Sequence, residues 1–170
     1  MLGDVRRTHP FLLTSEGSSP NDRYAEPHAF LSDRSLPVPD RLQQGLPRWE
    51  LSDPAPEEAG RAVAALASDS SLQPGSVDSL VLATSEVVAN ASVHGRHPVT
   101  VRGWSGQDAV VVAVHDHGAG PGYDELGLVP KPGPGSGLGF GLWIAHLLCD
   151  EVVQHVDDTG FTVRLRMRAR

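Results

Sequence analysis

The most informative segment of this 170-residue chain is EVVANASVH, which runs from Glu86 to His94. Its apolar residues recur with the period of a helix, and Gly95 follows where a helix would end. Glu86, Asn90 and His94 are spaced four residues apart, so a helix places their side chains together on one face. The segment therefore predicts a helix that carries a carboxylate, a carboxamide and an imidazole beside its apolar stripe.

Two interpretations of these three polar residues are open. Within a helix, an asparagine is most simply a surface residue or a capping group. Alternatively, the Asn90 carboxamide oxygen can bind a magnesium ion that also holds phosphate oxygens and water. Glu86, one helical turn earlier, can then act as a general base toward a hydroxyl group near the terminal phosphate. The spacing alone favours the surface interpretation, and the two later motifs reverse that preference.

The second motif is DHGAG, from Asp116 to Gly120, and it follows an apolar run that predicts a strand. A tight turn would explain an aspartate followed by glycines. A carboxylate at the end of a strand can equally accept a hydrogen bond from the exocyclic amine of adenine. Gly118 and Gly120 would then let the backbone pass close to the base. Taken in isolation, this motif does not distinguish the two interpretations.

The third motif is GLGFGL, from Gly137 to Leu142, where alternating glycines lead into a predicted helix. A flexible loop would explain the glycines. Against this, backbone amides at the start of a helix bind phosphate well, and glycines allow the close approach. The Gly-Lys-Ser/Thr ending of a Walker loop is missing, and the pattern of a dinucleotide-binding loop does not match. In this order and spacing, the three motifs together predict a nucleotide site.

The pattern from Arg48 onward is regular and predicts three helices and five strands. Residues 1–45 are instead polar and rich in proline, so we expect an extended or disordered arm followed by a folded domain over residues 46–170. A turn is expected at Gln73-Pro74-Gly75. The helices are expected to start near Asp53, to span 77–94 and to span 138–148. The strands are expected over 49–51, 99–104, 109–115, 151–156 and 161–168.

The composition excludes several classes of protein. A formal net charge of -7 disfavours electrostatic binding to nucleic acid, which needs a basic surface. No apolar run approaches the roughly 20 residues that span a bilayer, so we expect no membrane contact and a cytoplasmic location. Cys149 is the single cysteine, cannot form an internal disulfide and is expected to be a small buried residue.

The three motifs, over 86–94, 116–120 and 137–142, resemble those of the ATP-binding domain of the GHKL superfamily, whose fold is called the Bergerat fold. Within it, the chain is most similar to the anti-sigma factor serine/threonine kinases of sporulation and stress-response switches. Residues 84–95 resemble their asparagine box, 116–120 resemble their first glycine box, and 137–150 resemble the second glycine box of actinobacterial members. The resemblance covers residues 46–170. It implies a two-layer α/β sandwich in which about three helices cover one face of a mixed, mainly antiparallel sheet.

The same resemblance implies how ATP and Mg²⁺ would be bound. Asn90 would coordinate the metal, and Asp116 would bind adenine with the assistance of Thr162 on the last strand. Glu86 would activate a serine hydroxyl group for attack on the terminal phosphate, a transfer that depends mainly on positioning and charge neutralisation. The other residues that would contact ATP are His94, Gly118, Gly120, Gly137, Gly139, Phe140, Gly141 and Leu142.

The implied function is a regulator that phosphorylates an anti-anti-sigma partner of the STAS type on serine or threonine and sequesters a sigma factor. The alternative is a module that holds ATP without transferring phosphate and only sequesters its partners. Relatives commonly dimerise through the sheet edge or the first helix, so a homodimer also stays open. The catalytic half of a histidine kinase is disfavoured, because the proline-rich arm predicts no helix pair with a phosphorylated histidine.

Overall fold

The computed structural model describes residues 10–14, 17–24, 39–121 and 140–170. The chain forms two compact units, Met1–Arg34 and Ser35–Arg170. In the first unit, strands β1 (Phe11–Thr14) and β2 (Gly17–Pro20) pair as an antiparallel hairpin. The sequence predicted no regular element in this arm, because strands of four residues are too short to show a sustained alternation.

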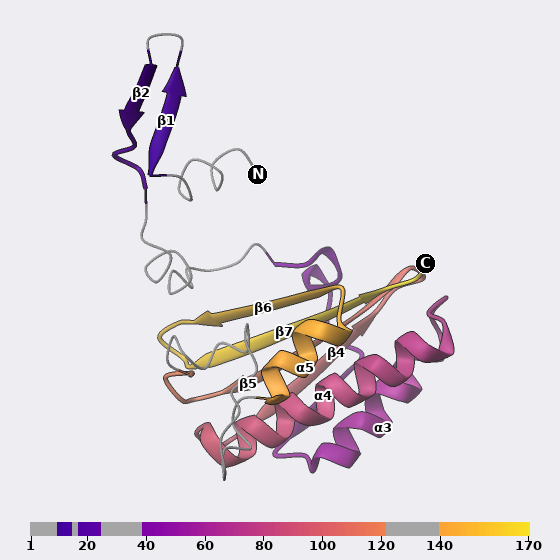
Figure 1. Cartoon of the computed structure of the whole chain (residues 1–170). Coiled ribbons are helices and arrows are strands. Elements are labelled where there is room, and N and C mark those ends of the chain that lie inside the picture. The colour runs from indigo at the N-terminus through magenta and orange to yellow at the C-terminus, as the bar shows by residue number, and fades with distance from the viewer. Residues whose placement is uncertain (1–9, 15–16, 25–38, 122–139) are drawn as a thin grey trace. The chain divides into compact units, whose positions relative to one another are not determined.

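The second unit is a sandwich of two layers, with a sheet behind and helices in front (Figure 1). The strand order is β3-β4-β5-β7-β6, and each neighbouring pair of these strands is antiparallel. The two-layer fold expected from the sequence is therefore confirmed, with antiparallel pairing throughout this sheet. The strands are β3 (Trp49–Ser52), β4 (Thr100–Ser105), β5 (Ala109–Asp116), β6 (Glu151–Val156) and β7 (Phe161–Arg168), and the helices are α3 (Pro56–Ala67), α4 (Pro74–His94) and α5 (Phe140–Leu148). No helix within the described ranges has the length and apolar character needed to cross a membrane.

Helix α4 begins three residues before the expected position. Pro74 and Gly75, which the sequence predicted as a turn, form its first helical turn. Proline is compatible with this position, because the first N–H groups of a helix have no partner within the helix. At the other end the helix stops at Gly95 as expected, where the Gly95 N–H donates to the carbonyl of Ala91 over 2.9 Å.

The main core lies between α4 and the sheet. Leu80, Val87 and Val88 of α4 are almost inaccessible to solvent, as are Val112 and Val114 of β5. These residues belong to one apolar cluster, against which the partly buried Cys149 also packs. Burial raises the pKa of the Cys149 thiol to about 12, so this cysteine is a packing residue rather than a reactive thiol.

The opposite face of the sheet is partly covered by a short 3-10 helix, η1 (Arg41–Gln44). Leu42 packs against a second buried cluster, formed by Trp104, Val111 and Ala113. The Trp104 Nε1–H donates to the carbonyl of Gly45 over 3.0 Å. Strand β5 is therefore buried on both faces, and residues that the sequence assigned to the arm take part in this folded unit.

Two arginines of β7 connect this segment to the sheet. Arg166 forms an ion pair with Asp40, whose side chain is 3 % exposed. Arg164 donates to Gln43 Oε1 over 3.2 Å and to Glu151 Oε1 over 2.9 Å. A buried carboxylate needs such a partner, because an unpaired charge in the interior is strongly destabilising.

Asp53 links the start of the helical layer to the edge of the sheet. Its backbone φ is +46°, a left-handed conformation that aspartate adopts more readily than most residues. Its Oδ1 accepts from the Val99 N–H over 2.7 Å and lies 2.6 Å from His97 Nδ1. The hydrogen bonds from Val99 and His97 hold the pKa of Asp53 below its usual value, and the hydrogen bond to Asp53 raises the pKa of His97.

This pair predicts a pH-dependent stability. Because the pKa of His97 is raised above 6.5 in the folded state, its stabilising contribution is complete below that value. The contribution is lost as the pH rises through the raised pKa, while Asp53 stays ionised. We therefore expect His97→Ala to lower the free energy of unfolding more at about pH 5.5 than at about pH 9.

Urea unfolding of both proteins across this range measures the difference. Asp53→Asn should show the same pH profile, because it removes the other half of the pair. A stability difference between wild type and His97→Ala that does not change with pH would contradict the prediction.

Candidate functional site

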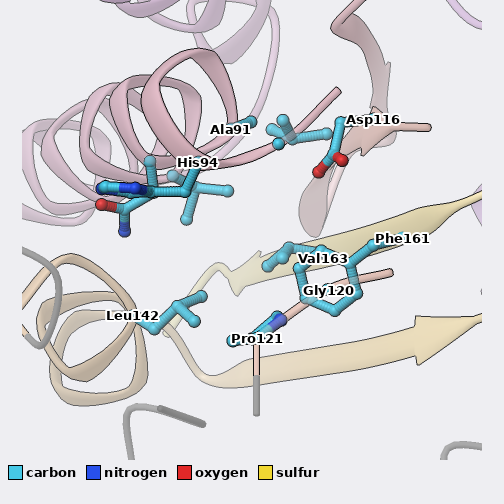
Figure 2. A pocket seen from close by; sticks show the side chains of 12 residues that line it. Ala91, His94, Asp116, Gly120, Pro121, Leu142, Phe161 and Val163 are labelled. Atoms are coloured by element: carbon cyan, nitrogen blue, oxygen red, sulfur yellow. The ribbon is translucent and has the colours of Figure 1, made fainter. Parts of the chain in front are cut away.

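A pocket of about 280 Å³ lies where α4, the N-terminal part of α5 and the ends of β5 and β7 meet (Figure 2). Its walls are mainly apolar, and its only polar side chains among the described residues are those of Asn90, His94 and Asp116. Such a combination is typical of a site for an organic ligand whose orientation is set by a few polar contacts. The lining residues are Val87, Asn90, Ala91, His94, Gly95, Val114, Asp116, Gly120, Pro121, Leu142, Phe161 and Val163.

Asp116 is held rigidly at the end of β5. Its side chain is nearly buried, and its Oδ1 accepts from the backbone N–H groups of Arg96 (3.1 Å) and Gly118 (2.7 Å). Two glycines make room for this carboxylate. A Cβ atom at Gly95 would lie 2.5 Å from Asp116 Cγ, and one at Gly118 would lie 2.7 Å from Asp116 Oδ1. The backbone therefore closes tightly around this carboxylate.

The second oxygen of Asp116 is left for a ligand. Figure 2 shows the carboxylate directed into the pocket. No described residue forms a hydrogen bond with its Oδ2. Gly120, which has a φ of +73°, passes along the same wall. The structure thus places Asp116 and Gly120 at the pocket, and Gly118 directly against Asp116.

The polar face of α4 supplies two further predicted residues. Asn90 and His94 line the pocket one helical turn apart. The Nδ2 of Asn90 is buried and has no hydrogen-bond partner among the described residues. His94 is more exposed and lies at the edge of the pocket. Glu86, one turn further toward the N-terminus of α4, is partly buried and does not line the pocket.

The second glycine motif is only partly described. Gly137 and Gly139 lie outside the described residues. Phe140 is 41 % exposed and does not line the pocket. Its ring packs edge-on against Trp143, with 6.2 Å between the ring centroids. Leu142 lines the pocket, and Gly141 lies against Asn90.

Thr162 does not lie where the sequence predicted. Its hydroxyl group lies 2.9 Å from His115 Nδ1, on the face of the sheet opposite to the pocket. Burial lowers the pKa of His115, which favours the neutral imidazole there. The structure therefore does not bring Thr162 to the pocket, since Phe161 and Val163 are the residues of β7 that line it.

The alternation of β7 explains the position of Thr162. Phe161 pairs with Asp116 across the strands, and its neighbour Thr162 pairs with His115. Because successive side chains of a strand point to opposite faces, Phe161 shares a face with Asp116 and Thr162 does not. The pairing of β5 with β7 would have identified Phe161, but it is not visible in a single strand.

Comparisons with known proteins identify a family for this chain. A family model described as "Histidine kinase-like ATPase domain" matches residues 53–167, which is more than half of the chain. Among solved structures, the chain is similar to the NMR structure of the histidine kinase domain of the E. coli osmosensor EnvZ, with 18% sequence identity and a TM-score of 0.41. That similarity covers 75% of this chain and 92% of the other. No curated protein matches the sequence.

The free oxygen of Asp116 predicts a specific loss in a variant. We expect Asp116→Asn to weaken ATP binding by about tenfold to a hundredfold, because a hydrogen bond to a charged acceptor is lost. Calorimetry measures the affinity, and Asp150→Asn is the control, since Asp150 bonds to Arg168 and Arg170 instead. Inosine triphosphate, which lacks the exocyclic amine, should bind the wild type weakly. Equal ATP affinities of Asp116→Asn and wild type would refute this role.

The positions of Phe161 and Thr162 predict opposite outcomes for two neighbours. We expect Phe161→Leu to weaken ATP binding by about twofold to tenfold, because the aromatic wall of the pocket is lost. Thr162→Val, which keeps the shape of the side chain, should leave the affinity unchanged. The reverse pattern in the same titrations would restore the role that the sequence assigned to Thr162.

Proposed function

The chain belongs to the histidine kinase-like ATPase domain family, and on this basis we propose that it transfers the terminal phosphate of ATP to a serine or threonine of a partner protein. The proposal depends mainly on Asp116. One oxygen of this carboxylate is fixed by two backbone N–H groups, and the other faces an apolar pocket. This arrangement suits a flat heterocycle that donates one hydrogen bond.

Adenine is the base that this arrangement supports best. Its exocyclic amine donates to a single acceptor. Guanine would present two adjacent donors to a carboxylate, whereas Asp116 Oδ1 is already occupied by Arg96 and Gly118. The apolar side chains of Val114, Phe161 and other lining residues would cover the faces of the base.

Asn90 is the residue that suits a magnesium ion bound to ATP. No group of three or more His, Cys, Asp and Glu side chains in the described part of the chain could hold a metal alone. Mg²⁺ commonly takes one or two protein oxygens and completes its shell with phosphate oxygens and water. The Asn90 Nδ2 is buried, so Oδ1 is the carboxamide atom left for such a contact. When bound, the metal would neutralise phosphate charge.

The order of residues along α4 supports a catalytic role for Glu86. The base end of the pocket lies at the C-terminus of α4, since Gly95 contacts Asp116. Each four-residue step toward the N-terminus advances about 6 Å along a helix. Asn90 and then Glu86 thus follow in the direction in which a triphosphate would extend. Glu86 would accept the proton of the attacking hydroxyl group.

The partners belong to the proposal as well. The likeness of residues 84–95 to the asparagine box of anti-sigma factor kinases supports an anti-anti-sigma substrate of the STAS type. It also supports a sigma factor as the sequestered target. The competing function is an ATP-dependent binding module without phosphate transfer, and one observation favours it: Glu86 does not line the pocket.

Glu86→Gln distinguishes the two functions. We expect this variant to bind Mg-ATP as the wild type does and to lose phosphate transfer by about a hundredfold or more, because a general base is removed. The assay incubates the protein with labelled ATP and a purified anti-anti-sigma partner. Glu58→Gln on the exposed side of α3 is the control. Equal labelling by Glu86→Gln and wild type would exclude Glu86 as the base, and ATP binding without labelling by the wild type would favour the binding module.

A further inference from the structure

Helices α4 and α5 approach each other closely at one point beside the pocket. A Cβ atom at Gly141 would overlap Asn90 Nδ2, and it would lie 3.1 Å from Asn90 Cγ and 3.3 Å from Oδ1. The three nearest atoms all belong to the carboxamide, so exchanging its oxygen and nitrogen would not relieve the overlap. The space that a side chain would take at position 141 is thus filled by Asn90.

The buried Nδ2 atom of Asn90 needs an explanation. Its Nδ2 has no hydrogen-bond partner among the described residues and is shielded from solvent. Native proteins retain few buried donors of this kind, because losing the hydrogen bonds to water is costly. An apolar residue would pack at this position without that cost. The retention of a carboxamide therefore indicates a role at the pocket rather than in folding.

We propose that Gly141 is a positioning residue for Asn90. The missing side chain lets the first turn of α5 rest on the carboxamide and fixes its orientation, so that Oδ1 is held at the pocket. This differs from the role implied by the family resemblance, in which Gly141 lets a phosphate approach the backbone. The consequence for Mg²⁺ rests on the proposed function, whereas the contact itself does not.

Two other helical glycines serve as matched controls. A Cβ atom at Gly60 of α3 would lie 3.0 Å from Ser85 Oγ and 3.2 Å from Val81 Cγ1, so this glycine also permits close helix packing, but away from the pocket. A Cβ atom at Gly75 of α4 would meet no atom within 4 Å. Gly60→Ala therefore measures the effect of a tight helix contact away from the pocket. Gly75→Ala measures the effect of replacing a helical glycine where no atom is in the way.

The first experiment is a double-mutant cycle without nucleotide, using Gly141→Ala, Asn90→Ala and the double variant. We expect Gly141→Ala to lower the stability of the wild type and to have little effect when position 90 is alanine, because the clash partner is then gone. Urea unfolding measures each stability. Effects that add independently would overturn the proposal. If Gly141→Ala alone does not fold, folding of the double variant supports the proposal and its failure to fold overturns it.

The second experiment measures ATP affinity with and without Mg²⁺. We expect Gly141→Ala to lose about tenfold or more of the Mg²⁺-dependent gain in affinity, a loss typical of residues that orient a metal ligand, while metal-free ATP binds unchanged. Gly60→Ala should keep the full gain, whatever the direction of its effect on stability. Equal weakening of ATP binding with and without Mg²⁺ would place Gly141 at the phosphates and overturn the proposal. A wild type that binds no ATP would refute the proposed function, while the unfolding cycle would still decide the contact.

Discussion

The packing of α4 on the sheet is the contact on which the rest of this structure depends. Its apolar face, with Leu80, Val87 and Ala91, is buried in the same cluster as Val112 and Val114 of β5. A leucine or valine side chain contributes about 1.5–3 kcal/mol when it is fully removed from water. The helix is thereby fixed in rotation about its axis, and Asn90 and His94 are brought to the margin where the apolar contact ends. The pocket lies at this margin, between the polar residues of α4 and the sheet.

Asp116 shows how the site is prepared before a ligand arrives. Burying a carboxylate is unfavourable unless its oxygens are bonded. Here the two backbone donors to Oδ1 offset part of that cost and also fix the orientation of the group. The other oxygen then needs no reorganisation when a donor approaches, which reduces the entropic cost of binding. Glycines at 95 and 118 are required for this arrangement because no side chain fits beside the carboxylate.

Most of the fold could be predicted from local periodicity, whereas parts of the site could not. The apolar faces of α4 and β5 are visible in their own residues, and so is the helix stop at Gly95. The expectation for Thr162 came from the family resemblance alone, whereas the pairing that places Phe161 beside Asp116 joins β7 to β5 and is not visible in a single strand. The contact between Gly141 and Asn90 joins two helices, so neither segment shows it in its own residue pattern. The 3-10 helix η1 is too short to show a period.

The cover that η1 provides has a consequence for any shortened form of this protein. A chain that starts at residue 46 would retain every residue of the pocket but would lose Leu42 and the carboxylate of Asp40. The cluster of Trp104, Val111 and Ala113 would then face water, beside an arginine without its counter-ion. An uncovered aromatic surface on a sheet face promotes self-association. Such a truncated protein would first fail by precipitating, even with its binding residues intact.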